Sequence, residues 1–307
     1  MIESALALNS PEAVAYQAQA LSSGDWRSVK LAPTPLPLEQ RAWQSVLTAL
    51  TQRGLTHINR VYLGSAYCHF LRWSKAELAT ALQTVQSANL NSTIVLDPQD
   101  DSSLKQSTRT IASLVDRFGS LEVEANDWGS LVSLGSTGAE VVAGPLLFKM
   151  KRLPRLTAHT RPIGIPTDMN VDVIRRRQLA EWSQFPADCA WAEQRLDALG
   201  IKRLEVEMVP QGIHFSDTGS RSISLHLPWT YITGGGSCPL LNTFTEKDVL
   251  CCTRNCRKTV IEAKFDSPTV PLRQFGHTVF AAMHGVLSAY CNEKRISRWV
   301  ISPVVPM

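Results

Sequence analysis

The architecture can be read from residues 60–98, which run RVYLGSAYCHFLRWSKAELATALQTVQSANLNSTIVLDP. The apolar run Arg60–Gly64 is typical of a short β-strand that ends at a glycine. Ser74 and Glu77 form a capping-box pattern, and the leucine and valine residues that follow recur on one face of a predicted helix. Thr93–Leu96 is a second apolar strand. The segment is therefore a predicted βαβ unit.

The same alternation of strands and helices continues toward the C-terminus. Further strands are predicted at 121–125, 141–143 and 204–209, and further helices at 104–118, from 170 onward and at 187–199. Strands that alternate with helices of this length indicate the α/β class and a parallel sheet. The number of units favours a (β/α) barrel of the TIM-barrel type, complete or incomplete, over an open sheet.

The N-terminal segment lacks this alternation. Three prolines, Pro33, Pro35 and Pro37, interrupt its helix-like apolar spacing, because each removes a backbone donor and disfavours helix in the residue before it. We therefore expect residues 1–55 to form an N-terminal extension. Residues 56–307 are expected to form a single barrel-like domain that carries a metal site.

Composition limits the class of protein. The chain has 307 residues, of which 44% are hydrophobic, so it can bury a sizeable core. Its formal charge of +4 and the lack of a dense lysine and arginine block give no indication of nucleic-acid binding. No apolar run approaches the roughly 20 residues of a membrane-spanning helix, and Met1–Ser4 carries no basic residue typical of an export signal. We expect a cytoplasmic protein without a membrane span.

Two predicted strands carry alternating carboxylates. In Leu121–Ala125 and Leu204–Met208 the apolar residues share one face and the glutamates share the other. A carboxylate inside a barrel is costly unless it reaches a polar cavity, and barrel active sites form at the carboxyl ends of the strands. Glu124, Asp127 and Glu207 are therefore candidate catalytic residues. The alternative is that they face solvent on an open or edge strand.

Cysteines gather near the C-terminus. Twelve residues separate Cys238 from Cys251, and three separate Cys252 from Cys256. Crowded thiols in a reducing compartment usually bind a metal, and Cys68 can supply a distant fourth ligand. The spacing leaves iron–sulfur, zinc and incidental packed thiols open.

Several segments together resemble the collagenase-like peptidase family, in the branch associated with oxygen-independent ubiquinone hydroxylation. Val61–Cys68 resembles its first strand and the cysteine that follows, and Glu124–Gly129 resembles its strand with an acidic residue and a glycine. Leu204–Glu207 and Val300–Pro303 resemble two later strands. The resemblance covers roughly residues 57–305.

The resemblance implies an oxygen-sensitive 4Fe-4S cluster, with Cys68, Cys238, Cys252 and Cys256 as the matching ligands. Cys251 keeps the spacing to Cys238, but Cys252 keeps the closer spacing to Cys256 and is preferred. His226, near Cys238 in the chain, is either a hydrogen-bond donor to the cluster or an ordinary structural residue.

The implied function is that of an iron–sulfur subunit of an oxygen-independent hydroxylase in ubiquinone biosynthesis. The resemblance implies a heterodimer with a UbiU-like protein, prephenate as the oxygen donor and a quinone precursor as the substrate. Two alternatives stay open: an RNA-base hydroxylase of the same family, and a non-catalytic partner with a structural cluster. Peptidase activity is not expected, because the chain has neither a Gly-x-Ser-x-Gly elbow nor a His-Glu-x-x-His helix.

Overall fold

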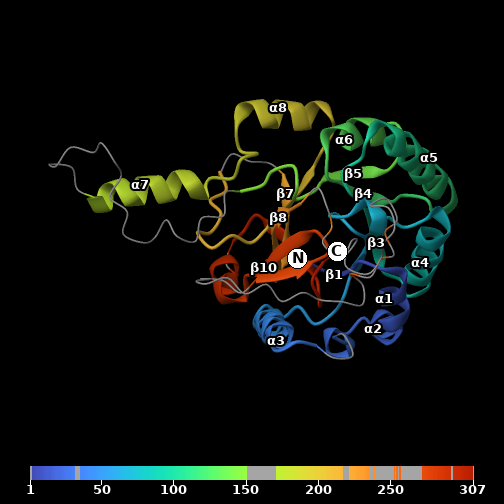
Figure 1. The fold of residues 1–307 in the computed structure, drawn as a ribbon, viewed down its shortest axis with the longest axis horizontal. Helices are drawn as coiled ribbons and strands as arrows, with labels where there is room; N and C mark the ends of the chain where they lie inside the picture. The colour runs from blue at the N-terminus through green and yellow to red at the C-terminus, as the bar shows by residue number, and fades with distance from the viewer. Residues whose placement is uncertain are drawn as a thin grey trace.

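The centre of the molecule is a closed barrel of eight parallel strands with helices around it (Figure 1). The computed structural model describes residues 2–31, 35–150, 171–216, 221–235, 272–291 and 293–306, together with Cys238, Cys252, Arg254 and Cys256. The predicted α/β fold of the TIM-barrel type is confirmed, and the barrel is closed. Its strands are β1 (Glu3–Leu8), β2 (Arg60–Gly64), β3 (Asn91–Val95), β4 (Glu122–Ala125), β5 (Glu140–Ala143), β6 (Arg203–Glu207), β7 (Ser222–Leu227) and β11 (Ile296–Ile301).

Several helices begin at a polar side chain that caps their first turn. In α4, Ser74 Oγ accepts from the Glu77 amide at 3.2 Å and Glu77 Oε2 accepts from the Ser74 amide at 2.7 Å, which confirms the capping box. In the part of the chain that the structure describes, no helix has both the length and the apolar character to cross a membrane. The α-helices are α1 (Pro11–Tyr16), α2 (Ala18–Ser23), α3 (Pro37–Gln52), α4 (Lys75–Ser87), α5 (Asp101–Phe118), α6 (Trp128–Leu134), α7 (Val171–Ser183) and α8 (Ala190–Ala198).

The structure differs from the expected extension at residues 1–55. Residues 3–8 form β1, which pairs in parallel with both β2 and β11 and so closes the barrel. Ala5 packs against Tyr62 and Val300 inside the barrel, while Leu6 and Leu8 belong to the core outside it. The alanines fit the barrel interior, but they lack the β-branched or aromatic side chains by which a strand is recognised in a sequence.

The two faces of the barrel strands differ in chemistry. The outward residues, such as Val61, Leu63 and Val123, join the helices in one large hydrophobic core. The inward face carries Tyr62 and several buried charged side chains. This inward polarity departs from the continuous apolar runs of most parallel sheets, so each buried charge needs a partner.

Ion pairs fill the amino end of the barrel interior. Arg298, only 2% exposed, donates to both oxygens of Glu122 at 2.6 and 3.1 Å, to Glu3 Oε2 at 2.6 Å and to Tyr62 Oη at 2.7 Å. Arg60 donates to Glu3 Oε1 at 2.8 Å and lies 3.5 Å from Glu122 Oε1. These contacts join β1, β2, β4 and β11, and they satisfy charges that would otherwise be buried without partners.

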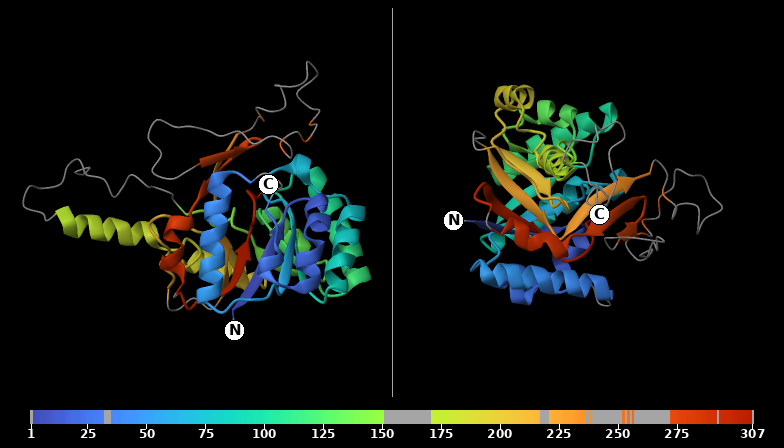
Figure 2. Two further views of the ribbon diagram at one scale, coloured as in Figure 1. Left: turned by 90° about the horizontal axis from the view of Figure 1, so that it is seen from below. Right: turned by 90° about the vertical axis from the view of Figure 1, so that its left-hand side faces the viewer.

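A second, antiparallel sheet lies at the carboxyl end of the barrel. Its order is β8 (Trp229–Gly234), β10 (Thr278–Ala282) and β9 (Leu272–Phe275). Figure 2 shows this sheet at the end of the barrel where the C-terminus lies, opposite the N-terminus. Tyr67, which follows β2, stacks on Tyr231 of β8 with ring centroids 5.5 Å apart and meets Phe280 of β10 edge-on at 4.9 Å. The small sheet therefore packs on the mouth of the barrel.

Replacing Arg298 should show how much the barrel depends on its interior ion pairs. Arg298→Met leaves Glu122 buried without its bidentate partner, so we expect the free energy of unfolding to fall by about 3–5 kcal/mol, measured by urea denaturation. Arg27→Met is the control, because Arg27 pairs with Asp25 on the surface with 88% of its side chain exposed. That variant should unfold like the wild type. Equal, small effects of the two substitutions would contradict the assigned role of Arg298.

Candidate functional site

Strands β4, β6 and β7 each direct at least two polar side chains into the barrel. Because successive residues of a strand point to opposite faces, residues two apart share the interior. Five of the six side chains are buried, and 15% of the His226 side chain is exposed. The alternative that these carboxylates face solvent on an edge strand is excluded by this burial and by the closure of the barrel. The inward pairs are Glu122 and Glu124, Glu205 and Glu207, and Ser224 and His226.

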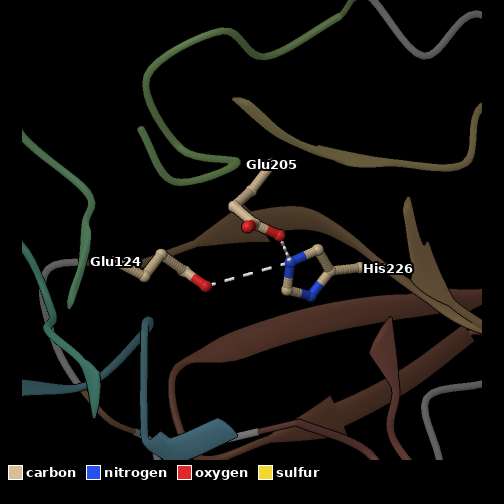
Figure 3. A group of neighbouring side chains, drawn as sticks. All are labelled: Glu124, Glu205 and His226. Carbon is tan, nitrogen blue, oxygen red and sulfur yellow. Dashed lines mark hydrogen bonds and ion pairs between the residues drawn. The ribbon is translucent and has the colours of Figure 1, made fainter. Parts of the chain in front are cut away.

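Glu124, Glu205 and His226 form a compact group, here called the carboxylate–imidazole group (Figure 3). His226 Nε2 lies 2.9 Å from Glu205 Oε2 and 3.8 Å from Glu124 Oε2. One donor atom from each of the three residues lies within 4.8 Å of the other two. Two carboxylates and an imidazole at this separation can hold a metal ion or pass a proton.

Neighbouring polar groups fix the two carboxylates. Tyr62 Oη donates to Glu205 Oε1 at 2.9 Å, and Asn126 Nδ2 donates to Glu124 Oε1 at 2.8 Å. Asn126 is itself held through its contact with the Leu96 carbonyl at 3.0 Å. A Cβ on Gly144 would overlap the Asn126 amide, so only glycine leaves room for this side chain. Each carboxylate thus has one oxygen held by a neighbour and one that faces the imidazole.

The electrostatics of the group follow from burial. Burial raises the pKa of Glu124 to about 7, and the positive charge of His226 only partly opposes this rise. Burial also favours a higher pKa for Glu205, but the hydrogen bond and charge of His226 outweigh it and lower that pKa. Burial would lower the pKa of His226, whereas the bond to Glu205 and the nearby carboxylates raise it. These shifts favour the ionised form of the Glu205–His226 pair, and Glu124 is close to its titration point at neutral pH.

A small pocket connects this group to the mouth of the barrel. Glu124 and His226 line its floor, and Ser65, Tyr67 and Ser302 line it nearer the strand ends. These residues come from β4, β7 and the segments that follow β2 and β11. A small polar molecule entering from the carboxyl end of the barrel would therefore meet Glu124 and His226, which is where barrel enzymes place their sites.

Glu207 lies at the junction between the barrel and the small sheet. Its Oε1 accepts from Tyr67 Oη at 2.8 Å and from the Tyr231 amide at 2.9 Å. His277 Nε2 contacts the Tyr67 carbonyl at 3.1 Å. Glu207 is 5% exposed, and its contacts tie β6 to the tyrosine that precedes Cys68.

The four predicted cysteine ligands lie in one neighbourhood, here called the cysteine group. Cys68 and Cys256 are buried in one apolar cluster with Trp229 and Phe280, and Cys238 packs against it. Burial raises the pKa of Cys68, and the proximity of Cys252 and Cys238 adds to the rise. Three chain segments thus bring the four cysteines into one region of the fold. Cys251, the alternative to Cys252, lies outside the described residues.

Backbone amides face the sulfurs of the cysteine group. The amides of Phe70 and Leu71 interact with the Cys68 sulfur and oppose the rise of its pKa. The Arg254 amide donates to Cys252 Sγ at 3.4 Å. N–H groups directed at thiolates are among the features that set the reduction potential of a bound iron–sulfur cluster. The donor set and its surroundings fit such a group.

Asp127 does not join the other two predicted catalytic residues. Its Oδ1 accepts from the Ser130 amide at 2.8 Å, and its Oδ2 accepts from Ser130 Oγ at 2.6 Å and from the Gln99 amide at 3.0 Å. The side chain caps α6, because an aspartate directly before a helix satisfies free amides of the first turn. The described contacts of Asp127 are therefore those of a helix cap, and its catalytic role stays a prediction.

Sequence reasoning missed Glu205 and His226 as members of the site. Glu205 shares a strand face with Glu207, so the period of two already indicated its direction. In Ser222–Leu227 the same period places His226 opposite three apolar residues. His226 lies in the barrel with Glu205 and Glu124, where its contacts differ from the predicted hydrogen bond to a cluster.

The fold and the site together define a closed (β/α) barrel with a polar interior and a cysteine group beside its mouth. In comparisons with known proteins, no family model and no curated protein matches the chain.

The raised pKa of Glu124 makes stability depend on pH. Between pH 4.5 and about 7 the unfolded chain has lost the Glu124 proton while the folded chain keeps it, so stability falls as pH rises through this window. Glu124→Gln removes this loss. Relative to the wild type, its free energy of unfolding in a chelating buffer should rise by on the order of 3 kcal/mol between pH 4.5 and pH 8.

Glu140→Gln provides the control, because Glu140 is an exposed carboxylate at the start of β5. Its unfolding free energy, measured by urea denaturation, should differ from that of the wild type by the same amount at both pH values. If the difference in unfolding free energy between Glu124→Gln and the wild type is also the same at both pH values, the pKa of Glu124 is not raised by folding.

Proposed function

We propose that this chain is an iron–sulfur protein in which Cys68, Cys238, Cys252 and Cys256 hold a 4Fe-4S cluster beside the barrel mouth. One observation carries the proposal. Thiols that are up to 188 positions apart in the sequence gather around buried Cys68. A buried thiolate without a partner is costly in free energy. A bound metal ion offsets that cost, so a group of buried thiols is typical of a metal site.

The cluster would bring one-electron transfer to the mouth of the barrel. The residues of the chain would shield the cysteine group from water and connect it to the pocket. Trp229 and Phe280 exclude water from the cysteine group, since both are almost fully buried. Tyr67 links the segment of Cys68 to Glu207, and Glu207 in turn holds the Tyr231 amide. This chain of contacts connects the cysteine group to the wall of the pocket.

We further propose that the protein acts in oxygen-independent hydroxylation as a UbiV-like subunit of the collagenase-like peptidase family. In this proposal it works in the cytoplasm, pairs with a UbiU-like protein and uses prephenate as the oxygen donor for a quinone precursor. The closed barrel, the grouped cysteines and the polar pocket support it. Glu124 and His226 line the pocket and would position a polar group of the substrate, and Glu207 would position Tyr67.

Iron analysis tests the cluster. Protein purified without air should contain about four iron and four sulfide per chain and show a broad visible absorption band. Cys68→Ala and Cys252→Ala should lose most of both, because each removes one of four ligands. Cys189→Ala is the control, since Cys189 is exposed at the start of α8. Zinc in place of iron, or an unchanged iron content in Cys68→Ala, would contradict the cluster proposal.

Isotope transfer tests the reaction. With the UbiU-like partner present and air excluded, prephenate labelled with oxygen-18 should give a labelled hydroxyl group on the quinone precursor. Glu207→Gln should reduce this transfer while iron content stays at the wild-type level, because Glu207 contacts the pocket wall and lies outside the ligand set. Label that enters from water, or full transfer by Glu207→Gln, would argue for a purely structural cluster or for another substrate.

A further inference from the structure

The carboxylate–imidazole group of the barrel interior is chemically distinct from the cysteine group. Its three residues come from adjacent or nearby strands, β4, β6 and β7, whose backbone is fixed by the barrel. Glu124 and Glu205 are at most 1% exposed. A rigid scaffold that aims one imidazole nitrogen and two carboxylate oxygens at a common point is what metal binding requires.

One carboxylate oxygen of the group accepts no hydrogen bond among the described residues. Glu124 Oε2 is buried and accepts no hydrogen bond there, while it faces His226 Nε2 at 3.8 Å (Figure 3). A buried carboxylate oxygen left in this way costs free energy. A cation bound between Glu124, Glu205 and His226 would supply the missing interaction.

The outer contacts of the group have the pattern of a metal site. Asn126 holds Glu124 Oε1 and Tyr62 holds Glu205 Oε1, so the other oxygen of each carboxylate is left for the common point. Second-layer hydrogen bonds of this kind orient the ligands of metal ions. Gly144 supports the arrangement, because any side chain there would displace Asn126.

The charges around the group also favour a cation. At the amino end of the barrel interior, Arg298 and Arg60 pair with Glu122 and Glu3. Arg203 donates to Ser224 and Ser297, and its charge helps to lower the pKa of Glu205. Arg298 reaches Glu205 Oε1 only at 3.9 Å. With His226 as a neutral ligand, two carboxylates bring two negative charges to the carboxyl end of the interior.

We propose that Glu124, Glu205 and His226 bind a divalent transition-metal ion in the barrel interior. One imidazole and two carboxylates suit first-row ions such as Mn(II), Fe(II) or Zn(II). Binding would displace the proton that His226 Nε2 shares with Glu205 in the metal-free protein. The pocket lined by Glu124 and His226 leaves a side of the ion open to an anionic oxygen of a small molecule.

The proposal does not rest on the iron–sulfur cluster, and the test keeps the two apart. Mn(II) is the probe, because it prefers oxygen and nitrogen ligands over thiolates. Titration of the anaerobically purified full chain, followed by the loss of the free Mn(II) electron paramagnetic resonance signal, should give one site per chain. Cys68→Ala should bind Mn(II) as the wild type does, whether or not it has lost iron.

Substitution of the ligands should weaken this site selectively. Glu205→Gln and His226→Gln should each lower the affinity for Mn(II) at least 10-fold. The control is Asp127→Asn, a carboxylate that caps α6 outside the group. Near-ultraviolet circular dichroism checks that each variant is folded.

A second measurement needs no variant. Electron spin-echo modulation of Mn(II) bound to the wild type should contain a coupling to one imidazole nitrogen. Binding of one Mn(II) per chain with this nitrogen coupling would support the site. If His226→Gln folds, the coupling should be lost in that variant. No retained Mn(II), or Mn(II) bound without nitrogen coupling, would overturn it and leave a metal-free buried ion pair.

Discussion

A buried guanidinium holds the barrel together. Arg298, on the last strand, contacts side chains from β1, β2 and β4 at once, so it joins strands on both sides of the barrel interior. The desolvation cost of such a charge is offset only when each of its donors meets an acceptor, and Glu3, Glu122 and Tyr62 provide those acceptors. The polar lining of the interior is therefore a set of mutually dependent groups.

The two ends of the interior use their charges differently. At the amino end, arginines and carboxylates are matched, and Thr93 adds a hydrogen bond to Glu122 at 2.5 Å. At the carboxyl end, Glu124 keeps an oxygen without a hydrogen-bond partner among the described residues. Matched charges stabilise a fold, whereas an unmatched buried oxygen is retained where a ligand or proton is to be bound. In (β/α) barrels the amino end of the strands usually serves stability, and the carboxyl end carries the active site. The charges of this barrel follow the same division.

Sequence patterns predicted the strands and helices better than the contacts that distant residues make with one another. The capping box of α4 and the alternating glutamates of β4 and β6 are local signals, and the structure bears them out. The sequence did not predict β1, because its inward residues are alanines, which have a low preference for strands. They fit there only because they pack against Tyr62 and Val300 inside the closed barrel. His226 was misplaced for a similar reason, since Glu124 lies 102 positions away and on another strand. The cap formed by Asp127 was not predicted, because a helix cap and an active-site carboxylate have the same sequence signature.

The pairing of β1 with β11 has a consequence for how the protein is made. Glu3 and Arg298 are 295 positions apart, so during synthesis β1 leaves the ribosome long before β11 can pair with it. Pairing between such distant segments slows folding and leaves a strand edge exposed meanwhile. We therefore expect one edge of β1 to stay unpaired during synthesis until β11 has left the ribosome.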